Sequence, residues 1–133
     1  MQTIINERQV PHPPEKVWRA LTDQRLLAQW MMENDFEPVP GRKFSFRTKP
    51  MANWNGIVNC EVLAVENNRR LSYAWNSTGE VVTWTLTPTK EGGTLLRMEH
   101  SGFGPEQQAN YQGANYGWQR FLGNLEKTLG TIA

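Results

Sequence analysis

The chain has 133 residues, and its 14 lysine and arginine residues against 13 aspartate and glutamate residues give a formal net charge of +1. This length predicts a single domain over residues 1–133, large enough to bury a core without disulfides or metals. Because the charges are balanced and interspersed, neither nucleic acid nor an anionic membrane is expected as a partner. No apolar run approaches the ~20 residues of a membrane span, so membrane insertion is not expected, and the first ten residues lack a signal-peptide pattern.

Cysteine and histidine usage narrows the chemistry further. Cys60 is the single cysteine, which excludes an internal disulfide and predicts a reducing, cytoplasmic setting. The two histidines, His12 and His100, lack metal-ligand spacing, so no metal site is expected. The glycines of "SGFGPEQ" follow a predicted strand without the lysine and Ser/Thr of a phosphate loop. The sequence therefore predicts no cofactor.

The N-terminal third predicts a strand and two short helices. A strand is expected near Ile4–Val10, where β-branched and polar residues alternate until "PHPP" ends the pattern. A helix is expected from Pro14, since proline in a first helical turn gives up no hydrogen bond. A second helix in "TDQRLLAQW" takes Thr22 or Asp23 as its N-cap. The side chains expected to be buried are Val17, Trp18 and Leu21 in the first helix and Leu26, Leu27 and Trp30 in the second.

Five further strands are predicted after Gly41, where the apolar period changes to two. Turn signals at Asn67-Asn68, Ser77–Gly79 and Glu91–Gly93 separate them and predict an antiparallel meander with one buried and one solvated face. The strand segments are "KFSFRT", "GIVNCEVLAV", "RLSYAWN", "EVVTWTLTP" and "GTLLRMEHS". The residues predicted to share the buried face are Phe44, Phe46, Val58, Cys60, Val62, Leu71, Tyr73, Trp75, Val82, Trp84, Leu86, Leu96, Met98 and His100.

A long helix is predicted over Ala109–Leu129, because apolar residues recur there three and four positions apart. Such a stripe suits a helix that lies across a sheet. Gly113, Gly117 and Gly123 each cost about 1 kcal/mol of helix propensity relative to alanine. We therefore expect either a close approach to another surface or a kinked first half. The apolar stripe consists of Ala114, Trp118, Phe121, Leu122, Leu125 and Leu129.

This order of elements resembles the START/Bet v-like (SRPBCC) superfamily and its α+β helix-grip fold. More narrowly, the chain is similar to homologues of the activator of heat-shock-protein-90 ATPase, of the C-terminal-domain type. The resemblance implies a curved antiparallel sheet wrapped around a long C-terminal helix, with two short helices after the first strand. The segments that carry it are "PHPPEKVWRALTD", the tryptophan of "LLAQW", "PGRKFSF", "WNGIVNCEVL", "RLSYAW", "VVTWTLTP", "GTLLRMEHSGF" and "GWQRFLGNLEKTL".

The resemblance fixes a fold more narrowly than a function, because one fold hosts many activities. The superfamily includes lipid carriers, plant hormone and flavonoid binders, polyketide cyclases and chaperone co-factors. One departure is "PVPGRKFSF", where Arg42 stands at a position that is glycine in many relatives. We expect this arginine to tighten or re-aim the turn before the strand.

A cavity between sheet and helix is the candidate site, because 6 tryptophans indicate either a heavy core or an aromatic-lined pocket. Two interpretations of Trp118 remain open: it is a core residue, or it belongs to the helical lid of the cavity. His100 is the polar group on the apolar face, and is either a hydrogen-bonded structural histidine, a group that orients a ligand, or an acid–base residue. The predicted ligand-binding residues are Phe44, Phe46, Val58, Tyr73, Trp75, Trp84, Leu86, Met98, His100, Trp118, Phe121 and Leu122.

Several residues outside this set have open alternatives. Arg8 needs a carboxylate or carbonyl partner, from Glu7 or Glu99, or else lies on a solvated face. Trp54 is a gate over the cavity, a partner contact, or a loop side chain folded back on the body. Hydroxyls that could reach a pocket mouth belong to Tyr73, Tyr111 and Tyr116.

The function predicted is non-catalytic binding of a small hydrophobic or aromatic molecule, such as a lipid, a flavonoid or a polyketide-like compound. One alternative is a co-chaperone-type interaction module that stimulates a heat-shock-protein-90 family ATPase in the stress response. A second alternative is a cyclase-like enzyme that uses His100. No catalytic partner for His100 is identified in the sequence, which disfavours the enzyme.

Overall fold

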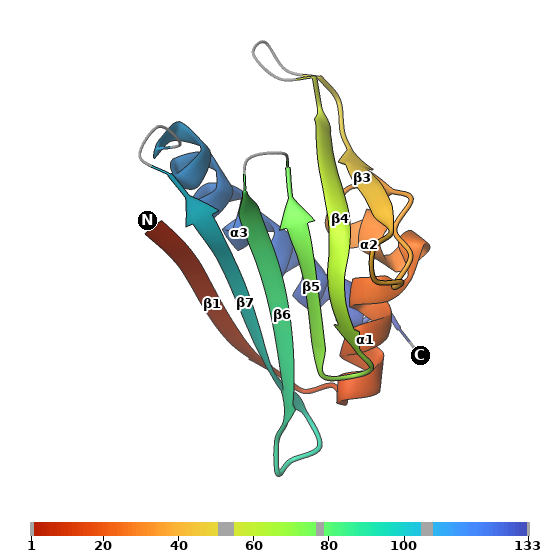
Figure 1. Cartoon of the computed structure of the whole chain (residues 1–133). Helices are drawn as coiled ribbons and strands as arrows, with labels where there is room; N and C mark the ends of the chain where they lie inside the picture. The colour runs from red at the N-terminus through yellow and green to blue at the C-terminus, as the bar shows by residue number, and fades with distance from the viewer. Residues whose placement is uncertain (1, 51–54, 77–78, 105–107, 133) are drawn as a thin grey trace.

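The strand that begins the chain and the strand that ends the meander pair with each other, and so set the sheet order. In this computed structural model, which describes residues 2–50, 55–76, 79–104 and 108–132, the seven-stranded antiparallel sheet has the order β1-β7-β6-β5-β4-β3-β2. The helices lie behind the curved sheet in Figure 1, which is the helix-grip arrangement. The elements are β1 (Gln2–Val10), α1 (Pro14–Thr22), α2 (Gln24–Trp30), β2 (Glu33–Asn34), β3 (Lys43–Arg47), β4 (Ile57–Glu66), β5 (Arg70–Trp75), β6 (Glu80–Pro88), β7 (Thr94–Phe103) and α3 (Gln108–Leu129).

The two short helices form as predicted, and Asp23 is the residue that separates them. Its carboxylate accepts hydrogen bonds from the backbone N–H groups of Arg25 and Leu26, which caps α2. The indole N–H of Trp30 donates to the carbonyl oxygen of Ala20 over 2.8 Å, which ties α2 to α1. The two-residue strand β2, not predicted from the sequence, pairs Glu33 with Arg47.

The alternation predicted for the meander is confirmed, with two irregularities. In β4 the register with β5 shifts between Val62 and Ala64, and Leu63, at this irregularity, is 46% exposed. In β7 the register with β1 shifts near Gly102, whose φ of +90° favours glycine. A Cβ on Gly102 would also collide with the carbonyl oxygen of Gly79. The shift turns Phe103 to the same buried face as His100.

The long helix α3 covers the sheet with the predicted stripe, because Trp118, Leu122, Leu125 and Leu129 are all buried. The expected close approach at the glycines is wrong. No heavy atom lies within 4 Å of a Cβ built on Gly113 or Gly123, and a Cβ on Gly117 would meet only the Phe121 ring, at 3.8 Å. These glycines therefore weaken the helix without relieving any contact.

Candidate functional site

Trp118 stands at the centre of a continuous set of aromatic rings between α3 and the sheet. Its ring centroid lies 5.6 Å from Trp84, in a T-shaped contact, and 5.5 Å from Trp75, in a tilted one. Phe121 packs on its other side at 5.7 Å. Edge-to-face geometry is favourable beyond the area it buries, so these rings bind the helix to the sheet. Through Trp75 and Tyr73 the set continues to Phe46 and Phe44.

A buried polar triad, Glu80–His100–Trp118, lies within these rings. The indole N–H of Trp118 donates to Nδ1 of His100 over 2.9 Å, and Nε2 of His100 lies 2.8 Å from a carboxylate oxygen of Glu80. An indole nitrogen only donates, so Nδ1 must be the acceptor and Nε2 carries the proton that is donated to Glu80. His100 is 0% and Glu80 2% exposed. Both ring nitrogens are therefore engaged within the protein.

Two further ionisable groups, Tyr73 and Cys60, are buried away from solvent in this interior. The Tyr73 hydroxyl accepts the indole N–H of Trp84 over 2.9 Å, and burial raises the pKa of this hydroxyl far above its usual value. Burial also raises the pKa of the Cys60 thiol to about 12, although a backbone hydrogen bond from Asn76 opposes that shift. Both groups stay neutral at physiological pH and act here as packing residues.

One flank of α3 brings the aromatic rings to the surface. Phe121 and Trp75, which both pack on Trp118, are only partly buried. Ala114 is partly buried as well and lies on the same side of α3 as Phe121, since residues seven apart share a helix face. We call Trp75, Ala114 and Phe121 the aromatic flank. The other predicted ligand-binding residues are buried: Phe44, Phe46, Val58, Tyr73, Trp84, Leu86, Met98, His100, Trp118 and Leu122.

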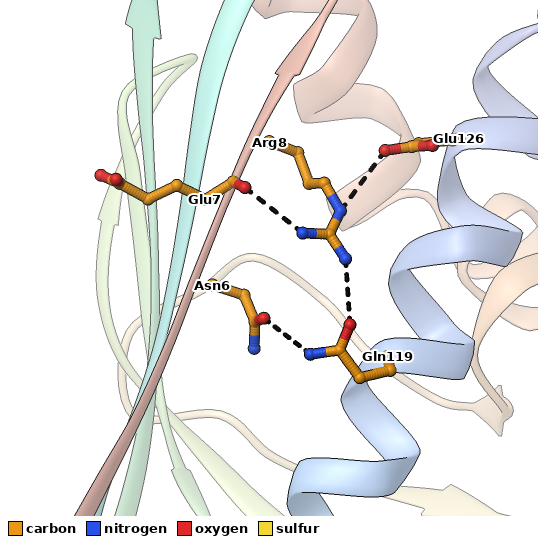
Figure 2. A network of polar contacts seen from close by, with 5 residues as sticks. All are labelled: Asn6, Glu7, Arg8, Gln119 and Glu126. Carbon is orange, nitrogen blue, oxygen red and sulfur yellow. Dashed lines mark hydrogen bonds and ion pairs between the residues drawn. The ribbon is translucent and has the colours of Figure 1, made fainter.

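The opposite flank of α3 is fastened to β1 by polar side chains, which Figure 2 shows. The guanidinium of Arg8 donates to Oε1 of Gln119 over 3.1 Å and lies 3.5 Å from the carboxylate of Glu126. Nε2 of Gln119 donates to Oδ1 of Asn6 over 2.9 Å. We call Asn6, Arg8, Gln119 and Glu126 the polar latch.

The latch confirms the prediction for Arg8 in part. Its carboxylate partner is Glu126 on α3, and from Glu7 it meets only the backbone carbonyl oxygen, at 3.4 Å. The carboxylates of Glu7 and Glu99 both pair with Arg97 instead, on the solvated face.

Surface hollows lie away from this interior. One, of about 490 Å³, is lined by Met31, Met32 and Arg47 among others, and a second, of about 290 Å³, lies beside Val10 and Glu91. Neither is lined by a predicted ligand-binding residue. The space between the described parts of the sheet and α3 is occupied largely by the aromatic side chains themselves.

The three tyrosines proposed to reach a pocket mouth differ in their exposure. The Tyr73 hydroxyl is buried, while Tyr116 is 70% exposed. Tyr111 is partly buried against Phe103, with ring centroids 5.4 Å apart. Trp54 lies outside the described residues.

Glu80 and Phe103 belong to the site and were missed from the sequence. The signal for Glu80 was present, because it shares the even positions of β6 with Val82 and Trp84. Its place beside a turn made a solvated carboxylate the ordinary expectation. Phe103 follows the bulge at Gly102, and its ring centroid lies 4.4 Å from that of His100.

Among the described residues, no helix is long and apolar enough to cross a membrane. No group of three histidine, cysteine, aspartate or glutamate side chains in the same part of the chain is placed to hold a metal ion.

A curved antiparallel sheet closed by a long C-terminal helix over an aromatic interior defines a helix-grip protein of the START/Bet v-like superfamily. Within it, the chain belongs to the family described as Activator of Hsp90 ATPase homolog 1-like protein, whose sequence model matches residues 11–130.

Solved structures agree with this assignment. Protein MLL2253 from Mesorhizobium loti is 48% identical, with 99% of both chains covered and a TM-score of 0.88. DynU16, a protein of the dynemicin biosynthetic locus, is 29% identical over 98% of this chain and 48% of that one, with a TM-score of 0.80. The Aha1 dimer structure from Colwellia psychrerythraea is 21% identical over 97% of this chain and 96% of that one, with a TM-score of 0.83. At this identity the likeness supports the fold alone. No curated protein matches the sequence significantly.

Proposed function

We propose that the protein binds a small apolar or aromatic molecule between the sheet and α3, without covalent chemistry. The observation that carries the proposal is the aromatic flank, where the partly buried rings of Trp75 and Phe121 lie directly over the buried Trp118. Ligand sites are mostly apolar and aromatic with few polar groups, which fits this interior. The likeness to DynU16, whose locus is biosynthetic, supports a small-molecule role.

Binding requires the aromatic flank to open, because aromatic side chains fill the interior between the described parts of the sheet and α3. Trp75 and Phe121 are only partly buried, so they can rotate outward at lower cost than the fully buried Trp84. The glycines of α3 lower the helix propensity of this covering element. A ligand that replaces these rings recovers apolar burial at about 25 cal/mol per Å².

Within this proposal His100 is a structural and orienting residue. Its two ring nitrogens are held by Trp118 and Glu80, so neither is free to exchange a proton with a substrate in this arrangement. A cyclase-like activity would need the triad to separate first. The triad instead fixes the orientation of Trp118, which forms the floor beneath the aromatic flank.

The test is an amide NMR titration with fatty acids, flavonoids and aromatic polyketides, comparing two variants of α3. Ala114→Trp adds a large ring to the aromatic flank, whereas Tyr116→Trp places the same ring at a position that is 70% exposed. Saturable shifts at Trp75, Trp118 and Phe121 are expected in the wild type. We expect affinity to fall about tenfold or more in the first variant and to stay unchanged in the second, since the added ring blocks entry only at the flank.

Two results would contradict the proposal. A flat titration of the wild type across the whole library would show that the rings serve only as core. Wild-type affinity in a folded Ala114→Trp protein would show that ligands enter elsewhere.

A second candidate function is favoured by the family itself, whose description is activation of a chaperone ATPase. In that case the protein acts through its surface, and filling the interior has no effect. Stimulation of a heat-shock-protein-90 ATPase by the wild type, retained in Ala114→Trp, would support this function. No stimulation by the folded wild type would count against it.

A further inference from the structure

The polar latch contains a hydrogen-bond donor whose orientation the network dictates. A guanidinium only donates, so the Gln119 atom that faces Arg8 must be its oxygen. The other end of the same amide is therefore the nitrogen, which donates to Asn6. The Asn6 atom facing Gln119 must in turn be Oδ1, and Nδ2 of Asn6 is left pointing elsewhere. Arg8 thus positions two amides in series.

This remaining donor is buried and has no partner. Among the buried side-chain nitrogen and oxygen atoms of the described residues, Nδ2 of Asn6 alone lacks a hydrogen bond. Leaving such a group unsatisfied costs about 1–3 kcal/mol, so an orphaned donor in a native protein calls for an explanation. Figure 2 shows this nitrogen in the space between β1 and α3, with no dashed contact to the residues drawn.

The surroundings of Asn6 identify the donor as part of the interior. Its side chain is on the inward face of β1, on which Ile4 is 4% exposed. Its register partner on β7 is Met98, which is 0% exposed. Other polar groups of the interior are already engaged, since Trp118 and Trp84 donate to His100 and Tyr73. A donor fixed beside apolar side chains is what orients a ligand in an otherwise apolar site.

We propose that Asn6 recognises an acceptor oxygen on the bound molecule, so that the ligand class is an aromatic compound bearing a carbonyl group. This inference rests on the proposed function, because it takes the space between sheet and α3 to be the binding site. Nδ2 of Asn6 donates to the carbonyl oxygen, and the aromatic part of the ligand packs against Trp118. Arg8 and Gln119 are positioning residues that hold the amide in this orientation.

The experiment compares two probes of matched shape that differ in one group. 2-Acetylnaphthalene carries a carbonyl oxygen, and 2-isopropenylnaphthalene replaces that oxygen by a methylene group. Affinities are measured by amide NMR titration in the wild type, in Asn6→Leu and in Gln119→Ala. Both variants lose the hydrogen bond between Asn6 and Gln119, but only Asn6→Leu loses the donor.

We expect the wild type to bind the ketone about tenfold more tightly than the alkene, as one buried hydrogen bond to a neutral acceptor allows. The preference should vanish in Asn6→Leu and only weaken in Gln119→Ala, which keeps the donor but loses the side chain that orients it. In the wild type, the side-chain amide protons of Asn6 should shift downfield with the ketone and not with the alkene. This last measurement needs no variant, so it decides the question even where Asn6→Leu fails to fold.

The outcomes separate this inference from the function on which it rests. Equal affinity for both probes, with saturable shifts at Trp118 and Phe121 but none at the Asn6 amide, would overturn the role of Asn6 and leave interior binding intact. No saturable binding of either probe, with the library titration also flat, would overturn both.

Discussion

The two flanks of α3 hold the helix against the sheet by different physical means. On the β1 side, the polar latch joins partly exposed groups, with side-chain exposures of 32% for Arg8 and 50% for Glu126. On the other side, rings of the aromatic flank pack on Trp118 without a hydrogen bond of their own that the structure records among the described residues. Directional bonds fix an orientation, whereas ring contacts can be exchanged for contacts with another ring. From this difference we expect α3 to open on the aromatic flank and to stay fixed at the polar latch.

Trp118 packs against Trp75 and Phe121 of the aromatic flank and also donates to His100, so removing it should have the largest effect. Trp118→Ala deletes a side chain that is 2% exposed and leaves Nδ1 of His100 without its donor. We expect the free energy of unfolding to fall by about 3–5 kcal/mol in urea denaturation. Tyr116→Ala, on the exposed side of the same helix, should change it by less than about 0.5 kcal/mol. A loss below about 1 kcal/mol for Trp118→Ala would mean that the rings do not hold α3.

Cys60 offers a native reporter of opening on the aromatic flank, because it is the register partner of Trp75. Its pKa, raised to about 12 by burial, leaves a thiolate fraction near pH 8 on the order of a thousandfold below that of a free thiol. Labelling by a disulfide reagent should therefore be slow in the native protein, accelerate as pH rises toward 12, and become fast in denaturant. A saturating ligand should change the native rate. Fast labelling of the native protein would show that this flank is open already.

Much of this arrangement could be predicted from the sequence, since local periodicity decides it. The inward faces of the strands and the buried stripe of α3 follow from spacing alone. The burial of Phe103 could not be predicted, because one extra residue at Gly102 reverses the alternation of inward and outward side chains after it. The contact between Arg8 and Gln119 could not be predicted either, because the two residues are 111 positions apart and no local pattern connects them.

Gly113→Ala tests whether the glycines of α3 weaken its hold on the sheet. Nothing lies within 4 Å of the added Cβ, so the substitution should stabilise the protein by about 0.5–1 kcal/mol through helix propensity. Thermal unfolding measures the gain, and Cys60 labelling should slow in parallel. Gly102→Ala is the control substitution with the opposite expected effect on stability. The φ of +90° at Gly102 and the neighbouring Gly79 carbonyl make alanine destabilising there. If Gly113→Ala were more stable but its Cys60 were labelled at the wild-type rate, the opening that exposes Cys60 would not involve the first half of α3.

Arg8→Gln should have the smallest effect on stability. The ion pair with Glu126 spans 3.5 Å between partly exposed groups, so solvent and salt screen it, and a loss of no more than about 0.5–1 kcal/mol is expected. The difference between variant and wild type should shrink further in 1 M salt. A loss above about 2 kcal/mol that persists in high salt would show that the latch, rather than the rings, carries the helix.

The pairing of β1 with β7 has a consequence for how the chain is made. Glu7 and Arg97, which meet across these strands, are 90 positions apart, so β1 emerges from the ribosome long before its partner. Loop-closure entropy opposes contacts at such separations, and folds that depend on them form slowly. The apolar inner face of the meander also stays uncovered until α3 has been synthesised. A nascent chain stalled before α3 is therefore the form of this protein that we expect to aggregate and to need a chaperone.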